Sequence, residues 1–269
     1  MSALPQPLPA DPAAANGLAA AGASLSPSLG GFQRSRAAAY EIKFLLTERT
    51  AQQVEQALRS RMQLDPYADR DAGGAYAITS TYLDTPRFDV FHRIGRHRYR
   101  KLRLRRYGDA PWRFLEQKTK RKDRVRKYRS RADEAQLAFL GAPLLLESWE
   151  GAWFHRQAAR WGLSPVCEVS YLRRAYFTEE DGSPLRLTFD RELRARSVTG
   201  WRAAASSDFV DIGEGEVICE FKFRGAMPAC FREVVEDFGI AARGASKYRR
   251  SALALGLASL DAARSSEHA

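Results

Sequence analysis

The sequence predicts an α+β fold in which helices surround an antiparallel sheet or barrel. At least seven segments alternate apolar and polar residues as strands do, and most of them are joined by turn sequences rather than by helices. A few longer segments instead repeat apolar residues at helical spacing. The chain has 269 residues, 45% of them hydrophobic, which is enough for one large core around such a sheet.

The first half of the predicted domain begins with the alternating segment "YEIKFLL" (40–46), which predicts a strand. Thr47 can then N-cap a helix over "ERTAQQVEQALRSRM" (48–62), where apolar residues recur every four positions. "GGAYAITSTYLD" (73–84) predicts a second strand that ends in a "DTP" turn, and "RFDVFHRIG" (87–95) predicts a short helix.

The next segments predict a long hairpin, in which "HRYRKLRLRRYGD" (97–109) turns through "YGDAP" into "PWRFLEQKTK" (111–120). "DRVRKYRSR" (123–131) predicts a further strand, and residues 133–162 are helical in character, with Gly162 at the end. Three more strands are expected at 164–177, 183–190 and 215–223. Two closing helices are expected at 227–239 and 246–260.

Charge and composition narrow the classes of partner. The chain has 43 Lys and Arg against 32 Asp and Glu, a formal net charge of +11, which favours anionic partners such as nucleotides, polyphosphates, nucleic acid or an acidic membrane. Its three cysteines form no CxxC pair and its four histidines lack metal-binding spacing, so buried thiols in a reducing compartment are expected.

No segment is apolar enough to span a membrane or to act as a signal peptide, so the sequence predicts a cytoplasmic protein. Residues 1–36 are rich in Ala, Pro, Gly and Ser and predict a disordered tail, as do residues 259–269. Residues 37–258 show no linker-like break and predict a single domain.

Charged residues recur on one side of several predicted strands, because successive strand residues point to opposite faces. This pattern fits a sheet with one solvated face, but repeated Arg and Lys on that side also fit a wet lumen that holds an anion. Guanidinium groups and ammonium groups together suit phosphates best. The residues that share a charged side within their strand are Glu41 and Lys43, Arg103 and Arg105, Glu116 and Lys118, Arg186 and Asp190, and Glu220 and Lys222.

The acidic residues on these strands have two interpretations. They pair with the neighbouring cations, or they hold a divalent metal that bridges phosphate oxygens, for which Mg²⁺ and Mn²⁺ need only one or two carboxylates. The chain contains neither a Walker A sequence nor G-x-G-x-x-G, so we expect side chains rather than a glycine-rich loop to bind phosphate.

Nine short motifs carry a resemblance to a known family. They are "YEIKF", "TSTYLDTP", "KLRLRRYG", "FLEQK", "RVRK", "YLRRAYF", "LRLTFD", "CEFKF" and "SKYRRS", in this order between Tyr40 and Leu255. In these motifs the chain resembles the vacuolar transporter chaperone (VTC) domain, the polyphosphate polymerase branch of the triphosphate tunnel metalloenzymes. The resemblance implies a closed antiparallel eight-stranded β-barrel, the triphosphate tunnel, with peripheral helices.

The resemblance also implies roles for individual residues. It implies catalytic roles for Arg103, Arg105, Arg186 and Lys247, phosphate binding by Lys43, Lys118, Lys127, Arg174 and Ser246, and a Mn²⁺ or Mg²⁺ ligand at Glu220. Two assignments depend on strand register, since Arg126 is an alternative to Lys127 and Arg173 is an alternative to Arg174.

One departure from the wider superfamily bears on activity. In relatives that hydrolyse triphosphates or cyclise ATP, the sequence of the first strand is similar to E-x-E-x-K. This chain has Ala39 at the position of the first glutamate. The resemblance therefore implies a polymerase that transfers the ATP γ-phosphate to a growing polyphosphate chain. Hydrolysis of triphosphate or short polyphosphate, and a non-catalytic polyphosphate sensor, stay as alternatives.

The expected partners are ATP and inorganic polyphosphate. Nucleic acid is less favoured, because a closed channel is too narrow for a duplex. Movement of the product across a membrane would need a separate membrane protein, since the sequence has no membrane segment of its own.

Overall fold

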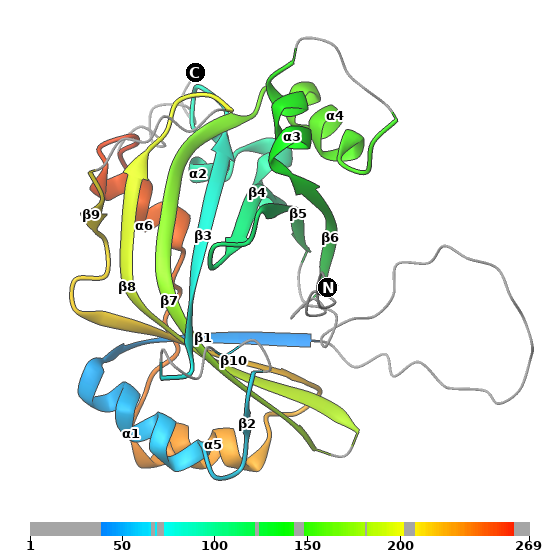
Figure 1. The fold of residues 1–269 in the computed structure, drawn as a ribbon. Coiled ribbons are helices and arrows are strands. Elements are labelled where there is room, and N and C mark those ends of the chain that lie inside the picture. The colour runs from blue at the N-terminus through cyan, green and yellow to red at the C-terminus, as the bar shows by residue number, and fades with distance from the viewer. Residues whose placement is uncertain are drawn as a thin grey trace, which may run out of the picture.

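A computed structural model describes residues 39–65, 68, 73–121, 124–142, 148–180, 182–201 and 208–260. The two predicted tails lie outside this part of the chain, apart from residues 259 and 260. Within it, ten strands form one antiparallel sheet (Figure 1). The strands are β1 (Ala39–Thr47), β2 (Gln63–Leu64), β3 (Ala75–Asp84), β4 (Arg100–Tyr107), β5 (Trp112–Arg121), β6 (Arg124–Asp133), β7 (Ser164–Glu180), β8 (Ser183–Ser197), β9 (Val210–Asp211) and β10 (Glu216–Arg224).

The helices lie around this sheet, which confirms the α+β prediction. They are α1 (Glu48–Leu58), α2 (Asp89–His92), α3 (Glu134–Leu137), α4 (Ala152–Arg160), α5 (Ala229–Asp237) and α6 (Lys247–Ala254), with 3₁₀ turns η2 (Gly95–Tyr99) and η3 (Ala138–Gly141). The predicted helical stretch 133–162 contains α3, η3 and α4, and strand β8 runs well past the predicted end at 190. None of the helices in the described part has the length and apolar character needed to cross a bilayer.

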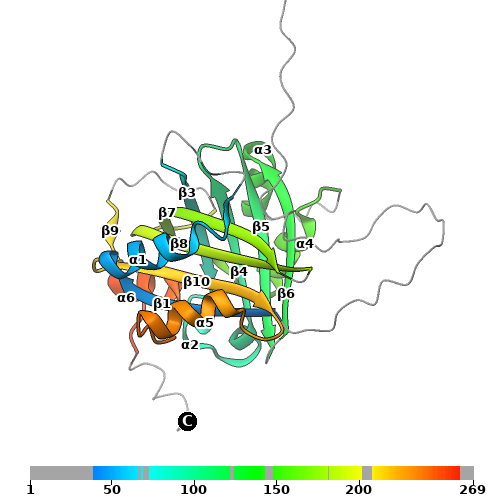
Figure 2. The ribbon, with the colours of Figure 1, turned by 90° about the horizontal axis from the view of Figure 1, so that it is seen from below.

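The order of the main strands is β1-β10-β8-β7-β3-β4-β5-β6, with β2 beside β7 and β9 beside β8. In the described residues the two end strands, β1 and β6, each pair with a single neighbour, so a closed barrel is not confirmed. The sheet is curved, and in Figure 2 the strands at one end cross the direction of those at the other. Backbone pairing needs strands about 5 Å apart, whereas two long side chains can meet across a wider gap.

Such a side-chain contact links the two ends of the sheet. Lys118 of β5 donates hydrogen bonds of 2.9 and 3.0 Å to the carboxylate of Glu41 on β1. The two sides of the curved sheet therefore face each other and share a space, although their backbones do not pair.

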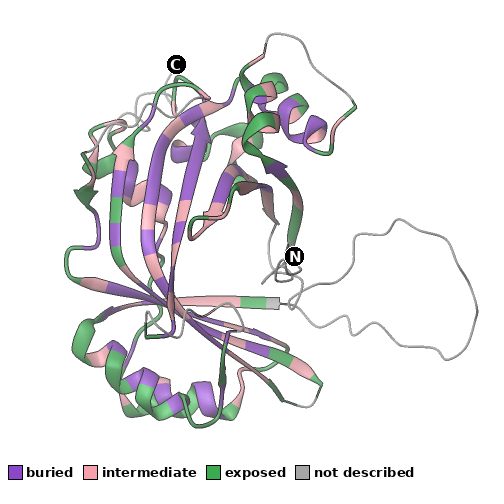
Figure 3. Cartoon of the chain, in the orientation of Figure 1, coloured by how far each residue is buried: buried purple, intermediate pink, exposed green. Residues whose placement is uncertain are grey.

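Helices α1 and α5 cover the lower part of the sheet's outer side (Figures 1 and 3). As predicted, Thr47 caps α1, accepting a hydrogen bond from Thr50 N at 3.2 Å, although the helix ends at Leu58 rather than at residue 62. Under these helices Phe44, Phe221 and Phe231 form a buried aromatic cluster, in which the rings of Phe221 and Phe231 stack. This core fixes β1 and β10 beside β8.

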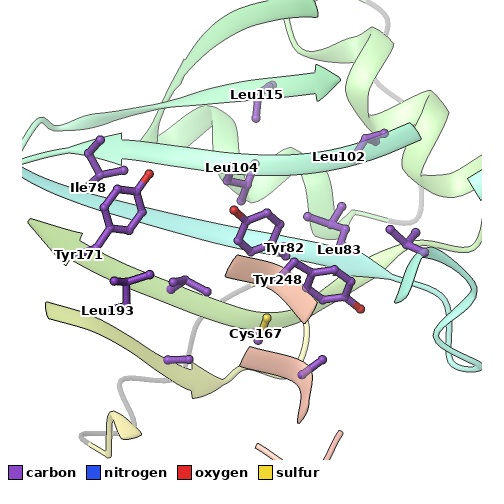
Figure 4. Close-up of a cluster of buried hydrophobic side chains, with 14 of the residues drawn as sticks. Ile78, Tyr82, Leu83, Leu102, Leu104, Leu115, Cys167, Tyr171, Leu193 and Tyr248 are labelled. Carbon is purple, nitrogen blue, oxygen red and sulfur yellow. The ribbon is translucent and has the colours of Figure 1, made fainter. Parts of the chain in front are cut away.

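A second core lies between the upper part of the sheet and α6 (Figure 4). The ring of Tyr248 on α6 lies 5.4 Å from that of Tyr82, and its hydroxyl donates to the buried carboxylate of Asp84 at the end of β3. The same carboxylate accepts from the backbone N–H groups that begin α2, among them Val90 N at 2.8 Å. Cys167 packs in this core, and all three cysteines are buried and free, as predicted.

Replacing Tyr248 with phenylalanine is expected to lower the free energy of unfolding by about 1.5–3 kcal/mol, because Asp84 loses a hydrogen bond to a buried charged group. Urea unfolding should show a lower midpoint with an unchanged m value. Tyr40→Phe is the control, since Tyr40 is exposed and should change stability by less than about 0.5 kcal/mol. Equal stability of the two variants would contradict the role given to the Tyr248 hydroxyl.

Candidate functional site

Side chains from strands that are not neighbours converge on the inner face of the sheet, which we define as the side carrying Lys43, Arg103, Lys118, Asp190 and Glu220. Besides the contact between β5 and β1, Lys247 of α6 donates a 2.6 Å hydrogen bond to Asp190 of β8. Burial lowers the pKa of Lys101, and the nearby charges of Arg93, Lys43 and Lys118 lower it further. A flat solvated face would not bring these strands together, so their charged side chains converge on the inner side of the curved sheet.

The predicted residues are found in this space with one exception. Lys43, Arg103, Arg105, Lys118, Lys127, Arg186, Lys247 and Glu220 share the inner face through their contacts or their mutual electrostatic influence. Four further cations, which the resemblance did not supply, join them: Lys101, Arg129, Arg173 and Lys222. We call these cationic side chains together the cation cluster.

The exception is Arg174, and it corrects the choice between two adjacent arginines. Arg174 donates to Glu55 of helix α1 at 2.9 Å, on the outer side of the sheet. Arg173 points inward and forms two hydrogen bonds of 2.6 and 2.8 Å with Asp190. Alternation permits only one of two neighbouring residues to face inward, and the sequence "LRRAY" does not say which one.

The structure agrees with the choice of Lys127 over Arg126 as the inward-facing residue. Lys127 lies opposite Lys118 in the pairing of β6 with β5, whereas Arg126 lies opposite Thr119 on the other side. Arg129, two residues after Lys127, also points inward and pairs with Glu116. The alternation could have identified Arg129, but basic residues occupy both even-numbered and odd-numbered positions of β6 and hide the pattern.

Two buried ion-pair groups position part of the cation cluster. Glu116 accepts from Arg103 at 2.6 Å and from Arg129, and Asp190 accepts from Arg173 and Lys247. Burial opposes the charge of both carboxyls, but the surrounding cations outweigh it and hold the pKa of each well below its ordinary value. These carboxylates stay ionised, so they fix the cations rather than transfer protons.

Arg105 is held without a carboxylate. Its guanidinium donates to Ser80 at 3.2 Å and to Tyr171 at 3.1 Å, and the residue is buried. Neutral oxygens orient a guanidinium without cancelling its charge. These two contacts therefore orient Arg105 and leave its charge unneutralised.

Helix α6 contributes its N-terminal end to the same space. Ser246 is the N-cap and accepts a 3.3 Å hydrogen bond from Lys101 Nζ, while Lys247 is the first residue of the helix. The partial positive charge at a helix N-terminus adds to that of the two lysines. Ser246 thus lies at the edge of the cation cluster.

Two carboxylates, Glu41 and Glu220, lie side by side where β1 pairs with β10. Lys43 Nζ is 3.3 Å from Glu41 Oε1 and 3.9 Å from Glu220 Oε2. Burial and the neighbouring Glu220 oppose ionisation of Glu41, but Lys222, Lys43 and Lys118 lower its pKa to about 2. Burial likewise opposes ionisation of Glu220, yet Lys222 and Lys43 hold its pKa well below the ordinary value.

The donor set at this point is compatible with a hard divalent cation. Glu220 Oε1 is buried and has no hydrogen bond of good geometry, although Lys222 Nζ lies 3.1 Å away. Among the described residues no three His, Cys, Asp or Glu side chains form a ready metal site. A pair of carboxylates can hold Mg²⁺ or Mn²⁺ when substrate phosphate oxygens and water supply further ligands.

The comparisons with known proteins agree with this geometry. The VTC domain matches residues 38–255. The chain belongs to the VTC domain family. The match covers most of the chain, which confirms the resemblance found in the nine motifs.

Solved structures place the VTC domain of this chain in a known fold. A putative adenylyl cyclase from Hippeastrum with a dominant triphosphatase activity aligns with a TM-score of 0.51 and 17% identity, over 80% of this chain and 95% of that one. A putative adenylate cyclase from Bacillus halodurans aligns with a TM-score of 0.45 and 15% identity, over 77% of this chain and 92% of that one. Identities this low show a shared fold alone. The search of curated proteins finds no match.

Crowding of cations in the VTC domain predicts proton uptake when a polyanion binds. Lys222 and burial lower the pKa of Lys127 to about 7. Burial and neighbouring cations lower the pKa values of Lys101 and Lys247 to about 8. For Lys247 they outweigh Asp190, which raises the pKa. A bound polyanion raises these pKa values, so affinity for tripolyphosphate should fall as pH rises from about 7 to 9.

Calorimetric titration at pH 8 in two buffers of different ionisation enthalpy measures this uptake directly. Lys127→Met should reduce it. The stability of the unliganded protein should change with pH in the opposite direction. Between these lowered pKa values and the ordinary lysine pKa, the unfolded chain binds more protons than the folded one. The free energy of unfolding without ligand should therefore rise with pH in that range. Affinity that stays constant from pH 6 to 9 would contradict the assignment.

Proposed function

We propose that this protein is a cytoplasmic, nucleotide-dependent polyphosphate polymerase that transfers the ATP γ-phosphate to a growing polyphosphate chain. The observation that carries the proposal is the cation cluster, in which strands from both sides of the curved sheet and the start of α6 face one space. Membership of the VTC domain family supports it. The triphosphatase activity of the Hippeastrum protein supports a triphosphate as substrate.

In this proposal the cation cluster binds the triphosphate of ATP and the end of the polymer in one line. Arg103, Arg105, Arg186 and Lys247 contact the reacting phosphates, and Lys43, Lys118, Lys127 and Ser246 bind the rest of the chain. Arg173 replaces Arg174 in this set because it is the inward-facing neighbour. Guanidinium groups bind phosphate oxygens in pairs, which fixes orientation as well as charge.

The reaction needs no covalent intermediate with the protein. A terminal phosphate oxygen of the polymer attacks the γ-phosphorus, a new P–O bond forms, and the bond to the β-phosphate oxygen breaks. ADP leaves with the electron pair of that bond, and the polymer is longer by one phosphate. Alignment and charge stabilisation supply most of the catalysis in such transfers, and a fixed group of cations supplies both.

Glu220 and Glu41 would hold a Mn²⁺ or Mg²⁺ ion together with substrate phosphate oxygens. When bound, such an ion would neutralise charge on the phosphates. The two carboxylates are ionised and adjacent, as a metal ligand pair requires. Lys43, which contacts both carboxylates, would then turn toward the phosphate.

Hydrolysis of a triphosphate or short polyphosphate at the same residues is the second candidate, and the triphosphatase activity of the Hippeastrum protein favours it. Ala39 favours transfer instead. It stands where the pattern E-x-E-x-K, which the first strand of hydrolytic relatives resembles, has its first glutamate. Export of the product would require a separate membrane protein.

Incubation of purified protein with ATP and Mn²⁺ tests the proposal. Polymer that runs as a ladder on a gel and disappears on phosphatase treatment is the expected product, with one ADP formed for each phosphate incorporated. Release of free phosphate without polymer would select the hydrolase. Binding of polyphosphate without nucleotide turnover or metal dependence would select a non-catalytic sensor.

A further inference from the structure

A second basic pocket lies on the outer side of strands β4 and β5, behind the wall that carries the cation cluster. It is a cavity of about 480 Å³ lined by Arg96, Arg100, Gln117, Gln157, Arg160 and Trp161. The lining comes from turn η2, from both strands and from the end of helix α4. Its volume is within the range of small-molecule binding sites.

The pocket is separate from the inner face. Lys101 and Lys118 point inward, and their chain neighbours Arg100 and Gln117 point to the other side, as alternation requires. The same two strands therefore carry the cation cluster on one face and the pocket on the other. A ligand in the pocket would not touch the proposed polymerase residues.

The charge of the pocket is uncompensated within the described residues. Arg96, Arg100 and Arg160 line it and no carboxylate does; Arg96 and Arg160 are exposed, and Arg100 is half-buried. Solvent screens the repulsion among these guanidinium groups in part, and an anion between them would remove it. Their planar forks match the oxygens of a phosphate group.

Two further side chains indicate more than a general basic surface. Arg100 stacks on the indole of Trp161 at 5.1 Å, which holds its guanidinium at the cavity wall. Gln157 has a buried side-chain oxygen, Oε1, with no hydrogen-bond partner in the described structure. A buried polar atom of this kind needs a partner, and a hydroxyl or amino donor of a nucleotide in the cavity would provide one, whereas ionised phosphate oxygens would not.

We propose that this pocket is a second binding site for a small phosphoanion. Two sources share that chemistry: a short inorganic polyphosphate, which presents phosphate oxygens alone, and an adenine nucleotide, which also presents hydroxyl and amino donors. The proposal does not depend on the polymerase reaction, because none of its residues belongs to the cation cluster.

Trp161 provides the readout. Titration of the purified protein with tripolyphosphate, and separately with ADP, should change tryptophan fluorescence, and Trp161→Phe should remove that change. Arg96→Ala combined with Arg160→Ala should weaken the affinity reported by Trp161 by about tenfold or more, because each guanidinium contributes a charge-assisted hydrogen bond. Arg156→Ala is the matched control, an exposed arginine of α4 outside the pocket, and should leave the affinity unchanged.

The two ligands distinguish the source. Tighter binding of ADP identifies a nucleotide site, and equal or tighter binding of tripolyphosphate identifies a site for phosphate alone. Arg103→Ala on the inner face should leave the Trp161 titration unchanged, so loss of polymerase activity and loss of this site are separable. The proposal is wrong if no Trp161-dependent change occurs, if the double variant titrates like the wild type, or if Arg103→Ala removes the signal.

Discussion

Replacing Arg103 with alanine is expected to lower the turnover number of the proposed phosphate transfer by a factor of about 100 to 1,000. Arg103 lies on the inner face of β4, and its Nε is fixed by a 2.6 Å hydrogen bond to Glu116. A cation held in place before the reaction stabilises the charge that develops on the transferred phosphate without rearranging. Water that replaces the side chain cannot do the same.

The fold should tolerate this change. Glu116 keeps its pairing with Arg129, so the substitution leaves no unpaired buried carboxylate. Stability measured by urea unfolding should therefore change much less than activity. Arg103→Lys should restore part of the turnover, since it returns the charge without the bidentate geometry.

Arg174→Ala is the control for this experiment. Like Arg103 it is an arginine in a strand of the same sheet, but it faces helix α1 and pairs with Glu55, which keeps Tyr176 and Arg191 as partners. Its turnover should stay within about twofold of the wild type. An equal loss of turnover in both variants, or no loss of turnover in Arg103→Ala, would show that the inner face does not take part in the mechanism.

The strand pattern of the sequence predicts most of the site because charge alternation depends only on local geometry. Lys43 and Glu220 lie on the predicted faces, each in a strand where apolar residues occupy the neighbouring positions. Lys118 also lies on its predicted face, although its two neighbours are the polar residues Gln117 and Thr119. The pattern fails where two basic residues are adjacent, as at Arg173 and Arg174. There the choice is made by partners distant in sequence, Asp190 on one side and Glu55 on the other.

Closure of the sheet depends on properties that alternation does not encode. Strand β7 has a register irregularity against β8 between Ser170 and Leu172, and another lies between β3 and β7 at Tyr82. Such irregularities bend a sheet and set where its end strands lie. The contact of Lys118 with Glu41 shows that a common interior forms through side chains even where the end strands do not pair.

Replacing Asp190 with alanine is expected to lower the free energy of unfolding by about 3–5 kcal/mol. Asp190 has no solvent exposure and accepts hydrogen bonds from Arg173 and Lys247. Its removal leaves two buried cations without the carboxylate that compensates them, beside other cations of the cation cluster. Glu233→Ala is the control, because its ion pair with Arg61 is exposed and contributes at most about 1 kcal/mol.

The pH dependence of this loss follows from the pKa of Asp190. Burial raises that pKa, but Arg173 and Lys247 outweigh burial and hold it below the ordinary value. The stabilisation is therefore complete above the unfolded-state pKa of about 3.9 and is lost as pH falls through the lower folded-state value. Urea unfolding should show the full difference between wild type and Asp190→Ala at pH 7 and a smaller one at pH 3.

A bound polyanion should compensate for the missing carboxylate. Tripolyphosphate places negative charge in the same space as Arg173 and Lys247, so it should raise the melting temperature of Asp190→Ala more than that of the wild type. A protein that binds no anion on its inner face would show no such difference. The stability of this one variant, with and without ligand, thus tests both the ion pairs that build the cation cluster and the anion that the cation cluster is proposed to bind.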